Sequence, residues 1–392
     1  MFHIATPEDI KRGRVTDVYF QRAAEVLRKN GIRRQVVAEV HAAALPRGCE
    51  WAVLAGVEEV AELAEGLPAT VRCLPEGTVF GPNEPVLTIE GEYTDWAVYE
   101  TPLLGLLCQA SGVATTAARC RIAAGDRTLV SFGARRMHPA LAPMIERSAY
   151  LGGCDGVSAV ASAELLGLPP SGTMPHALIL VIGNAVEAFR MYHEAMPADV
   201  PRVCLVDTLC DEKFEALAAA EALGPALQAV RLDTPGSRRG DMEAILAEVR
   251  WELDLRGHQH VKLMVSGGLD EREILKLNRY ADGYGVGTAI SNAPVVNLAL
   301  DIVEVEGKPL TKRGKLSGRK SLLRCPDCAE RRTVPAGEQA VCRCGRPMAD
   351  MLLPLTENGK PVREMRPIGE LREYVLAQLS ALSLRPALPE QP

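Results

Sequence analysis

The chain has 392 residues, which is long for one ordinary domain and predicts two or three. Hydrophobic residues make up 47% and charged residues 24%, the balance typical of a globular protein in water. The net charge of −6 argues against a surface for nucleic acid or anionic membrane. The first residues do not resemble a signal peptide, and no run approaches ~20 apolar residues. We therefore expect a cytoplasmic protein with no membrane partner and no nucleic acid.

Residues 1–105 are expected to form a small, strand-rich α/β domain. A short helix pattern opens the chain and leads to Tyr19. Between residues 36 and 99 the sequence alternates in places and is interrupted by Pro-Glu-Gly and Gly-Pro-Asn, which are typical turn sequences. One amphipathic helix is predicted over residues 56–67.

Residues 106–300 alternate between strand and helix patterns. Repeated strand–helix units imply a parallel sheet with right-handed crossovers. Seven candidate strands favour an α/β barrel, here an incomplete one, and no GxGxxG motif follows the first strand to indicate a dinucleotide-binding fold. The candidate strands cover residues 128–134, 153–159, 171–175, 202–208, 227–234, 260–268 and 283–288.

Residues 301–392 should form a third region that carries four clustered cysteines and a final helix. Cys325 and Cys328 form C-x2-C, and Cys342 and Cys344 form C-x-C thirteen residues later. Four thiolates on two short turns suit tetrahedral Zn²⁺ in a closed, structural site. Disulfides are the alternative, which a reducing cytoplasm disfavours. Nearby arginines leave open a zinc ribbon that binds nucleic acid, which the overall acidity disfavours.

Polar residues and glycines follow several of the predicted barrel strands. In parallel α/β barrels this edge of the sheet carries the active site, and the last two strand loops commonly bind phosphate. Glycines let backbone N–H groups approach phosphate oxygens closely. The pattern predicts a pocket for a sugar 5-phosphate. Its candidate residues are Arg135, Arg136, His176, Asp207, Arg231, Asp233, Ser266, Gly267, Gly268, Gly287 and Thr288.

An ordered set of motifs resembles the nicotinate phosphoribosyltransferase family. The motifs are TDVYF (16–20), FGARRMHP (132–139), AYLGGCDGVS (149–158), GTMPHA (172–177), VRLDTPGSRRGD (230–241), VSGGLD (265–270) and GVGT (285–288). The resemblance implies a small α/β domain packed on an incomplete α/β barrel. It also implies a homodimer, or a higher oligomer, with shared active sites, and residues 1–20 packing near a site.

The resemblance also assigns roles to individual residues. Tyr19 would reach from one subunit into its neighbour's site and stack on a pyridine ring, with Phe132 on the other face. Arg135 would address the ligand, and a guanidinium suits a carboxylate or phosphate. Arg231 and Asp233 would lie at the ribose and base. Arg136, His138 and Thr173 join the substrate-binding candidates because they belong to the same motifs.

Three further residues are assigned by the resemblance. Ser158 stands where nicotinamide-using relatives place an aspartate, so we expect less negative charge there and a preference for the acid over the amide. His176 matches a histidine that ATP phosphorylates in coupled members of the family. Asp207 would be a nearby carboxylate for Mg²⁺ or the phosphoribosyl group.

The implied reaction joins nicotinate to 5-phosphoribosyl 1-pyrophosphate and gives nicotinate mononucleotide and pyrophosphate, with Mg²⁺ and, in coupled members, ATP. Three alternatives stay open. A quinolinate phosphoribosyltransferase would share the architecture, and a zinc-ribbon protein could bind nucleic acid. A Schiff-base aldolase acting through Lys262 would also fit the fold.

Overall fold

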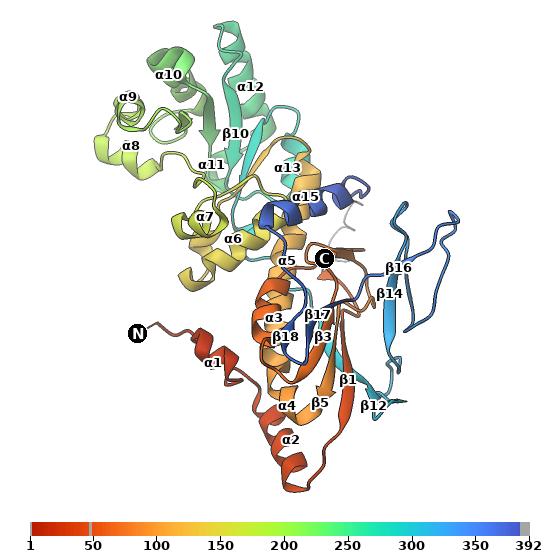
Figure 1. Ribbon diagram of the computed structural model, residues 1–392. Coiled ribbons are helices and arrows are strands. Elements are labelled where there is room, and N and C mark those ends of the chain that lie inside the picture. The colour runs from red at the N-terminus through yellow and green to blue at the C-terminus, as the bar shows by residue number, and fades with distance from the viewer. Residues whose placement is uncertain (1, 47–48, 385–392) are drawn as a thin grey trace. The chain divides into compact units, whose positions relative to one another are not determined.

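A computed structural model describes residues 2–46 and 49–384, and these fall into two compact units (Figure 1). The first unit runs to Thr115 and includes Pro294–Gln378, and the second contains Thr116–Ala293 with Leu379–Leu384. The region after residue 301 therefore does not stand apart, since most of it packs with the N-terminal segment. The boundaries expected at residues 105 and 300 remain predictions.

The first unit is built on an antiparallel sheet of seven strands in the order β13-β12-β1-β5-β3-β17-β18. Its sequence-distant halves are joined directly, because β1 pairs with β12 and β3 pairs with β17. The strands are β1 (Gln35–His41), β3 (Ala69–Cys73), β5 (Leu87–Glu92), β12 (Ala299–Val305), β13 (Lys308–Pro309), β17 (Leu353–Glu357) and β18 (Lys360–Pro361), and β2 (Ala52–Val53) pairs separately with β4 (Val79–Phe80).

Helices complete this unit. Helix α3 falls within the residues predicted to be helical, 56–67. It packs on β3 and β17, with its apolar residues Val57, Val60 and Leu63 in the core. Alternate residues of β5 are buried, as expected for a strand with one face on a core. The helices are α1 (Pro7–Lys11), α2 (Val18–Lys29), α3 (Val57–Ala64), α4 (Tyr93–Trp96), α5 (Glu100–Ala124), which continues into the second unit, and α15 (Ile368–Leu379).

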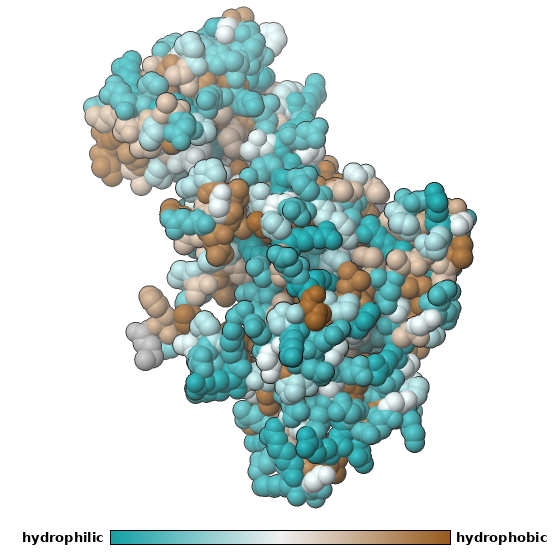
Figure 2. Space-filling view, in the orientation of Figure 1, coloured by the Kyte–Doolittle hydropathy of each residue, from teal (hydrophilic) through white to brown (hydrophobic). Residues whose placement is uncertain are grey.

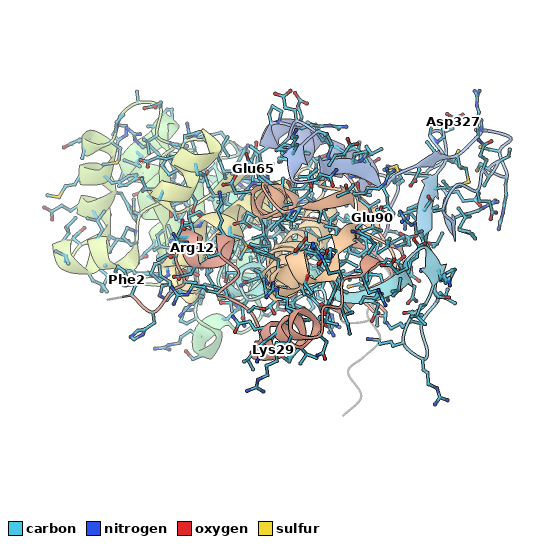
Figure 3. The ribbon with its side chains drawn as sticks, turned by 60° about the horizontal axis from the view of Figure 1, so that its bottom comes forward. Phe2, Arg12, Lys29, Glu65, Glu90 and Asp327 are labelled. Carbon is cyan, nitrogen blue, oxygen red and sulfur yellow. The ribbon has the colours of Figure 1, made fainter. Side chains whose placement is uncertain are left out.

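The four cysteines lie beside a small sheet of β15 (Arg331–Pro335), β14 (Lys320–Arg324) and β16 (Ala349–Asp350). Two side-chain contacts hold this sheet in the first unit. The Arg331 guanidinium donates to both carboxylate oxygens of Glu84 at 2.9 and 3.0 Å, and Arg324 donates to the Tyr374 hydroxyl on α15. Figure 3 labels Asp327 in the loop between the first two cysteines, where its carboxylate pairs with Arg346 at 2.7 Å.

The second unit contains a parallel sheet of six strands in the order β7-β6-β11-β10-β9-β8. The edge strands β7 and β8 do not pair with each other, so the barrel is incomplete as predicted. One of the seven candidate strands, residues 171–175, is a loop instead, since two prolines precede it and a third ends it. The strands are β6 (Thr128–Ser131), β7 (Gly156–Val157), β8 (Val203–Leu205), β9 (Ala229–Leu232), β10 (Lys262–Ser266) and β11 (Gly283–Val286).

Helices connect these strands, and α10 and α12 pack against each other (Figure 1). The predicted apolar stripe of α12 is buried at Met242, Leu246, Val249 and Leu253. In the described part of the chain, no helix is long and apolar enough to cross a membrane. The helices are α6 (Ala142–Leu151), α7 (Val160–Leu166), α8 (His176–Ile182), α9 (Ala185–Ala195), α10 (Glu212–Leu223), α11 (Gly236–Arg239), α12 (Met242–Leu255), α13 (Glu271–Leu277) and α14 (Thr288–Ser291).

Candidate active site

A cavity of about 320 Å³ opens at the C-terminal ends of four adjacent strands, β6, β11, β10 and β9. This is the edge of a parallel α/β sheet at which active sites form. Most of the residues predicted for the pocket line it: Phe132, Arg135, Arg136, Arg231, Asp233, Ser266, Gly267, Gly268, Gly287 and Thr288.

The two glycine-containing loops lie side by side because their strands are neighbours in register. Met264 on β10 aligns with Gly283 on β11, and Ser266 aligns with Gly285. Gly267 and Gly268 adopt φ angles of +82° and +64°, a left-handed conformation that disfavours other residues. The turn ends at Asp270, whose carboxylate accepts two backbone N–H groups of α13 at 2.9 Å. The loops thus present exposed backbone in a fixed shape.

Phe132 lies over β11 because Gly285 has no side chain. A Cβ atom at Gly285 would stand 2.3 Å from the Phe132 ring. The Arg231 guanidinium carbon lies 6.0 Å from the centre of the same ring. One face of the cavity is therefore an aromatic ring, with a cation near it and the two exposed guanidinium groups of Arg135 and Arg136 at the rim.

Arg231 is 9% exposed and is held by three oxygens. Its guanidinium donates to Ser266 Oγ at 2.8 Å, to the Met174 carbonyl at 3.2 Å and to Asp233 Oδ2 at 3.3 Å. Burial lowers the pKa of Arg231, while Asp233 and Asp207 oppose that shift. The arginine fixes the positions of β9 and β10 at the base of the cavity and remains a cation.

His176 faces two carboxylates. Its Nε2 lies 3.7 Å from Asp207 Oδ1 and 3.8 Å from Asp233 Oδ2, while Nδ1 lies 2.9 Å from the Thr208 hydroxyl. The other oxygen of Asp207 accepts the Asp233 N–H at 2.7 Å, and Oδ1 is buried with no hydrogen-bond partner among the described residues. Burial raises the pKa of Asp207 above its usual value. The carboxylate oxygens could take a cation or ligand hydroxyls.

Besides His176 and Asp207, three predicted residues of this unit, His138, Thr173 and Ser158, are not among those that line the cavity. His138 accepts the Ala140 N–H through Nδ1 at 3.2 Å and begins a short 3-10 turn. The Thr173 hydroxyl donates to the Met174 carbonyl at 3.3 Å. Tyr19 belongs to the first unit, where it lies on α2 with 58% exposure. Their predicted roles remain untested.

The surroundings of Ser158 correct one expectation. We expected serine to leave this position without a negative charge, but the buried carboxylate of Glu146 lies within hydrogen-bond distance. Glu146 Oε1 accepts both the N–H and the hydroxyl of Ser158 at 2.9 Å, and Oε2 accepts the Ala159 N–H at 3.0 Å. These three neutral donors stabilise the carboxylate without cancelling its charge.

Sequence reasoning missed several residues that shape the site. Glu146 on α6 holds the loop after β7, and Glu215 on α10 accepts the backbone N–H groups of residues 208–210. Thr208 contacts His176, and Arg239 binds the Ser266-Gly267 turn. Glutamates within helix patterns look like solvent-facing charges, so burial, which the sequence does not reveal, is the property that sets them apart.

The four predicted cysteines come together at one point of the first unit. Their sulfur atoms all lie within 4.8 Å of one another; Cys328 lies 3.3 Å from Cys342 and 4.0 Å from Cys344, and Cys325 lies 3.5 Å from Cys344. Tetrahedral zinc with Zn–S bonds of ~2.3 Å requires S···S separations of about 3.8 Å. Backbone N–H groups of Cys328 and Asp327 lower the pKa of the Cys325 thiol to about 7. The group could hold a metal ion such as zinc.

Comparison with known proteins agrees with this architecture. Residues 17–111 match the N-terminal domain model of quinolinate phosphoribosyl transferase, and residues 113–301 match its C-terminal domain model. The nicotinate phosphoribosyltransferase pncB1 of Mycobacterium tuberculosis is 32% identical over 94% of this chain and 91% of its own length. This chain belongs to the nicotinate phosphoribosyltransferase family.

Solved structures support the fold of the family member. A structure titled nicotinate-nucleotide pyrophosphorylase from Pyrococcus furiosus is 52% identical, with a TM-score of 0.96, covering 98% of this chain and 99% of that one. Human nicotinic acid phosphoribosyltransferase is 21% identical with a TM-score of 0.70 over 94% of both chains, which shows the fold alone. The predicted family and fold class are both confirmed.

Proposed function

We propose that this chain is a nicotinate phosphoribosyltransferase, which acts in NAD synthesis. The pyridine nitrogen of nicotinate would displace pyrophosphate from C1 of 5-phosphoribosyl 1-pyrophosphate and form nicotinate mononucleotide. The observation that carries this proposal is the cavity at the strand ends, where two glycine loops, an aromatic face and exposed arginines meet. Those features fit a phosphate, a flat ring and a carboxylate, the three recognition groups of the two substrates together.

The 5-phosphate would bind at Ser266, Gly267 and Gly268 and at Gly287 and Thr288. Backbone N–H groups in such turns bind phosphate oxygens, and the positive φ angles of the first pair hold the turn in shape. The register of β10 and β11 supports a single phosphate that both loops contact. The Arg136 guanidinium at the rim would help to hold the pyrophosphate leaving group.

Nicotinate would stack on Phe132 and direct its carboxylate to Arg135. Offset stacking contributes about 0.5–1.5 kcal/mol beyond the burial of area. In a homodimer or higher oligomer, Tyr19 of the partner subunit would cover the other face of the ring. Tyr19 is 58% exposed in the single chain, so its ring is free to contact another subunit. Hydrophobic residues exposed over α8, Leu180 and Val181 at 58% and 86%, also suit a protein contact (Figure 2).

Asp207 and Asp233 would hold the ribose hydroxyls and Mg²⁺, and Arg231 would keep Asp233 in place. When bound, Mg²⁺ neutralises charge on the departing pyrophosphate. Because nicotinate is a ready nucleophile, the chain's task is to align the reactants and stabilise charge. His176, with Nε2 facing both carboxylates, would accept a phosphoryl group if ATP hydrolysis is coupled.

The preference for acid over amide would rest mainly on Arg135. The Ser158 hydroxyl donates to Glu146, so toward a ligand it can only accept a hydrogen bond. A nicotinamide carboxamide could donate to that oxygen, but it would leave the arginine without an anion. His138 and Thr173 would shape the loops beside the pocket. We therefore propose that the charge of Arg135 selects the substrate.

The cysteine group would bind one structural Zn²⁺ per chain. Four thiolates leave no open coordination position for chemistry. Without metal, the short strands around the cysteines have little apolar core of their own. We propose a cytoplasmic location, because a four-thiolate zinc site suits a reducing compartment.

The test is turnover of 5-phosphoribosyl 1-pyrophosphate and Mg²⁺ with nicotinate, nicotinamide or quinolinate in separate reactions, with and without ATP. We expect nicotinate mononucleotide from nicotinate and little product from nicotinamide. Product from quinolinate alone would assign the chain to the activity for which its domain models are named. No turnover together with salt-sensitive retention on DNA would favour the nucleic-acid alternative.

A further inference from the structure

The sequence VRLDTPGSRRGD contains two adjacent arginines, Arg238 and Arg239, that the proposed chemistry does not use. Both lie in the short helix α11 after β9. The structure separates them clearly: Arg238 is exposed, whereas Arg239 is partly buried. The two side chains therefore have different surroundings although they are neighbours in sequence.

Arg239 joins two loops at the edge of the cavity. Its Nε donates to the Thr234 carbonyl, in the loop after β9, at 3.2 Å. Its Nη2 donates to the carbonyls of Ser266 and Gly267, in the loop after β10, at 3.3 and 2.5 Å. Carbonyls that accept from Arg239 are fixed in orientation, and the peptide planes of the turn are fixed with them.

The guanidinium also occupies the side of the turn where side chains would project. A Cβ atom at Gly267 would stand 3.1 Å from Arg239 Nη2 and 2.7 Å from Asp233 Oδ1. At Gly268 the nearest atom would be Arg239 Nη1 at 3.5 Å. The two glycines and the arginine are therefore parts of one arrangement, although more than 25 residues separate them in sequence.

Arg239 forms no direct ion pair among the described residues, although the Asp233 carboxylate, which pairs with Arg231, lies beside the same turn. Carbonyl oxygens accept its hydrogen bonds, and no carboxylate among residues 2–46 and 49–384 lies within 4.0 Å of its guanidinium nitrogens. Arg231, in contrast, has Asp233 at 3.3 Å. A partly buried guanidinium that donates only to carbonyl oxygens keeps its positive charge available to attract an anion. The nearest exposed backbone is the Gly267-Gly268 turn of the cavity.

We propose that Arg239 is a positioning residue for anion binding: it holds the Gly267-Gly268 turn in shape and supplies a positive charge beside the bound phosphate. The inference rests on the proposed function only in naming that phosphate as the 5-phosphate of the sugar substrate. Arg238, which is exposed on the same short helix, has no such role.

The experiment measures binding of ribose 5-phosphate by calorimetric titration to the full chain and to Arg239→Gln, Arg239→Lys and Arg238→Gln. We expect Arg239→Gln to weaken binding at least tenfold and Arg238→Gln to change it less than twofold. Arg239→Lys, which keeps the charge but loses the paired carbonyl contacts, should fall between them. If Arg239→Gln does not fold, Arg239→Lys alone decides the test, and it must then show weaker binding of ribose 5-phosphate than the wild type. Nicotinate affinity, measured separately, should stay within twofold in all folded variants.

A double substitution tests whether the turn and the arginine act together. If Arg239 works through the turn, Gly268→Ala and Arg239→Gln should weaken ribose 5-phosphate binding less in combination than the sum of the two single effects. Wild-type affinity in folded Arg239→Gln or Arg239→Lys would overturn the inference, and so would an equal loss in Arg238→Gln. If Arg239→Gln loses ribose 5-phosphate while the wild type turns over none of the pyridine substrates, the anion role stands and the proposed function fails.

Discussion

Replacing Gly268 by valine tests the phosphate turn most sharply. Gly268 has a φ of +64°, so a β-branched residue there would strain the left-handed backbone by roughly 1–2 kcal/mol. Its Cβ would lie in ordinary contact with Arg239 Nη1 at 3.5 Å, so the first atom of the new side chain causes no severe clash. If the turn shifts and two backbone hydrogen bonds to phosphate are lost, binding weakens by ~3–6 kcal/mol at ~1.5–3 each. That corresponds to at least ~100-fold.

Gly307→Val is the matched control. Gly307 has a φ of +73° and no atoms within 4 Å of its added Cβ, and it follows β12 in the first unit. Both variants should therefore lose similar backbone stability, while only Gly268→Val should lose affinity for 5-phosphoribosyl 1-pyrophosphate in calorimetric titration. Equal affinity of the two folded variants for that substrate would refute the assignment of the turn to phosphate.

Three further predictions concern charged and metal-binding groups. Asp207→Asn should raise the unfolding temperature at pH 7, because burial raises the Asp207 pKa and the ionised carboxylate therefore destabilises the folded state. Turnover should fall roughly 100-fold or more. A lower unfolding temperature would contradict this reasoning. Burial, with Asp301 nearby, raises the Glu100 pKa from 4.5 to about 7, so the free energy of unfolding should decrease as pH rises across that interval. Glu100→Gln should remove about 1–2 kcal/mol of this pH dependence, after allowance for partial exposure. An unchanged dependence of stability on pH in that variant would contradict the assignment to Glu100. Elemental analysis should find roughly one zinc per chain in the wild type and none in Cys325→Ser, whose unfolding temperature should be lower by roughly 5 °C or more. The exposed Cys210 is the control, and Cys210→Ser should change neither property. A wild type that is equally stable without metal would refute the zinc site.

Much of the second unit followed from local patterns. Strands that alternate with helices place their C-terminal ends at one edge, so residues after Ser131, Leu232, Ser266 and Val286 converge whatever the details of packing. Left-handed glycines at 267 and 268 are also local features. The cysteine spacing identified a group that could hold a metal ion, because C-x2-C followed by C-x-C places four thiols on two turns.

Other features depended on long-range packing and could not be predicted. The pairing of β1 with β12 joins residues more than 250 positions apart, and no local pattern encodes that register. Residues 171–175 looked like a strand from position alone, yet flanking prolines keep them in a loop. Glu146 shows the limit most clearly: its sequence neighbours suggest a surface helix, while three hydrogen bonds make it a buried anchor for the Ser158 loop.

A direct competition between two pyridines measures which of them accepts the phosphoribosyl group. The protein is given equimolar nicotinate and quinolinate, the latter carrying ¹³C in its 2-carboxyl group, with limiting 5-phosphoribosyl 1-pyrophosphate, Mg²⁺ and ATP. We expect nicotinate to be consumed in step with pyrophosphate release, and no labelled carbon dioxide to form. Labelled carbon dioxide in step with pyrophosphate, with nicotinate untouched, would contradict the proposed function.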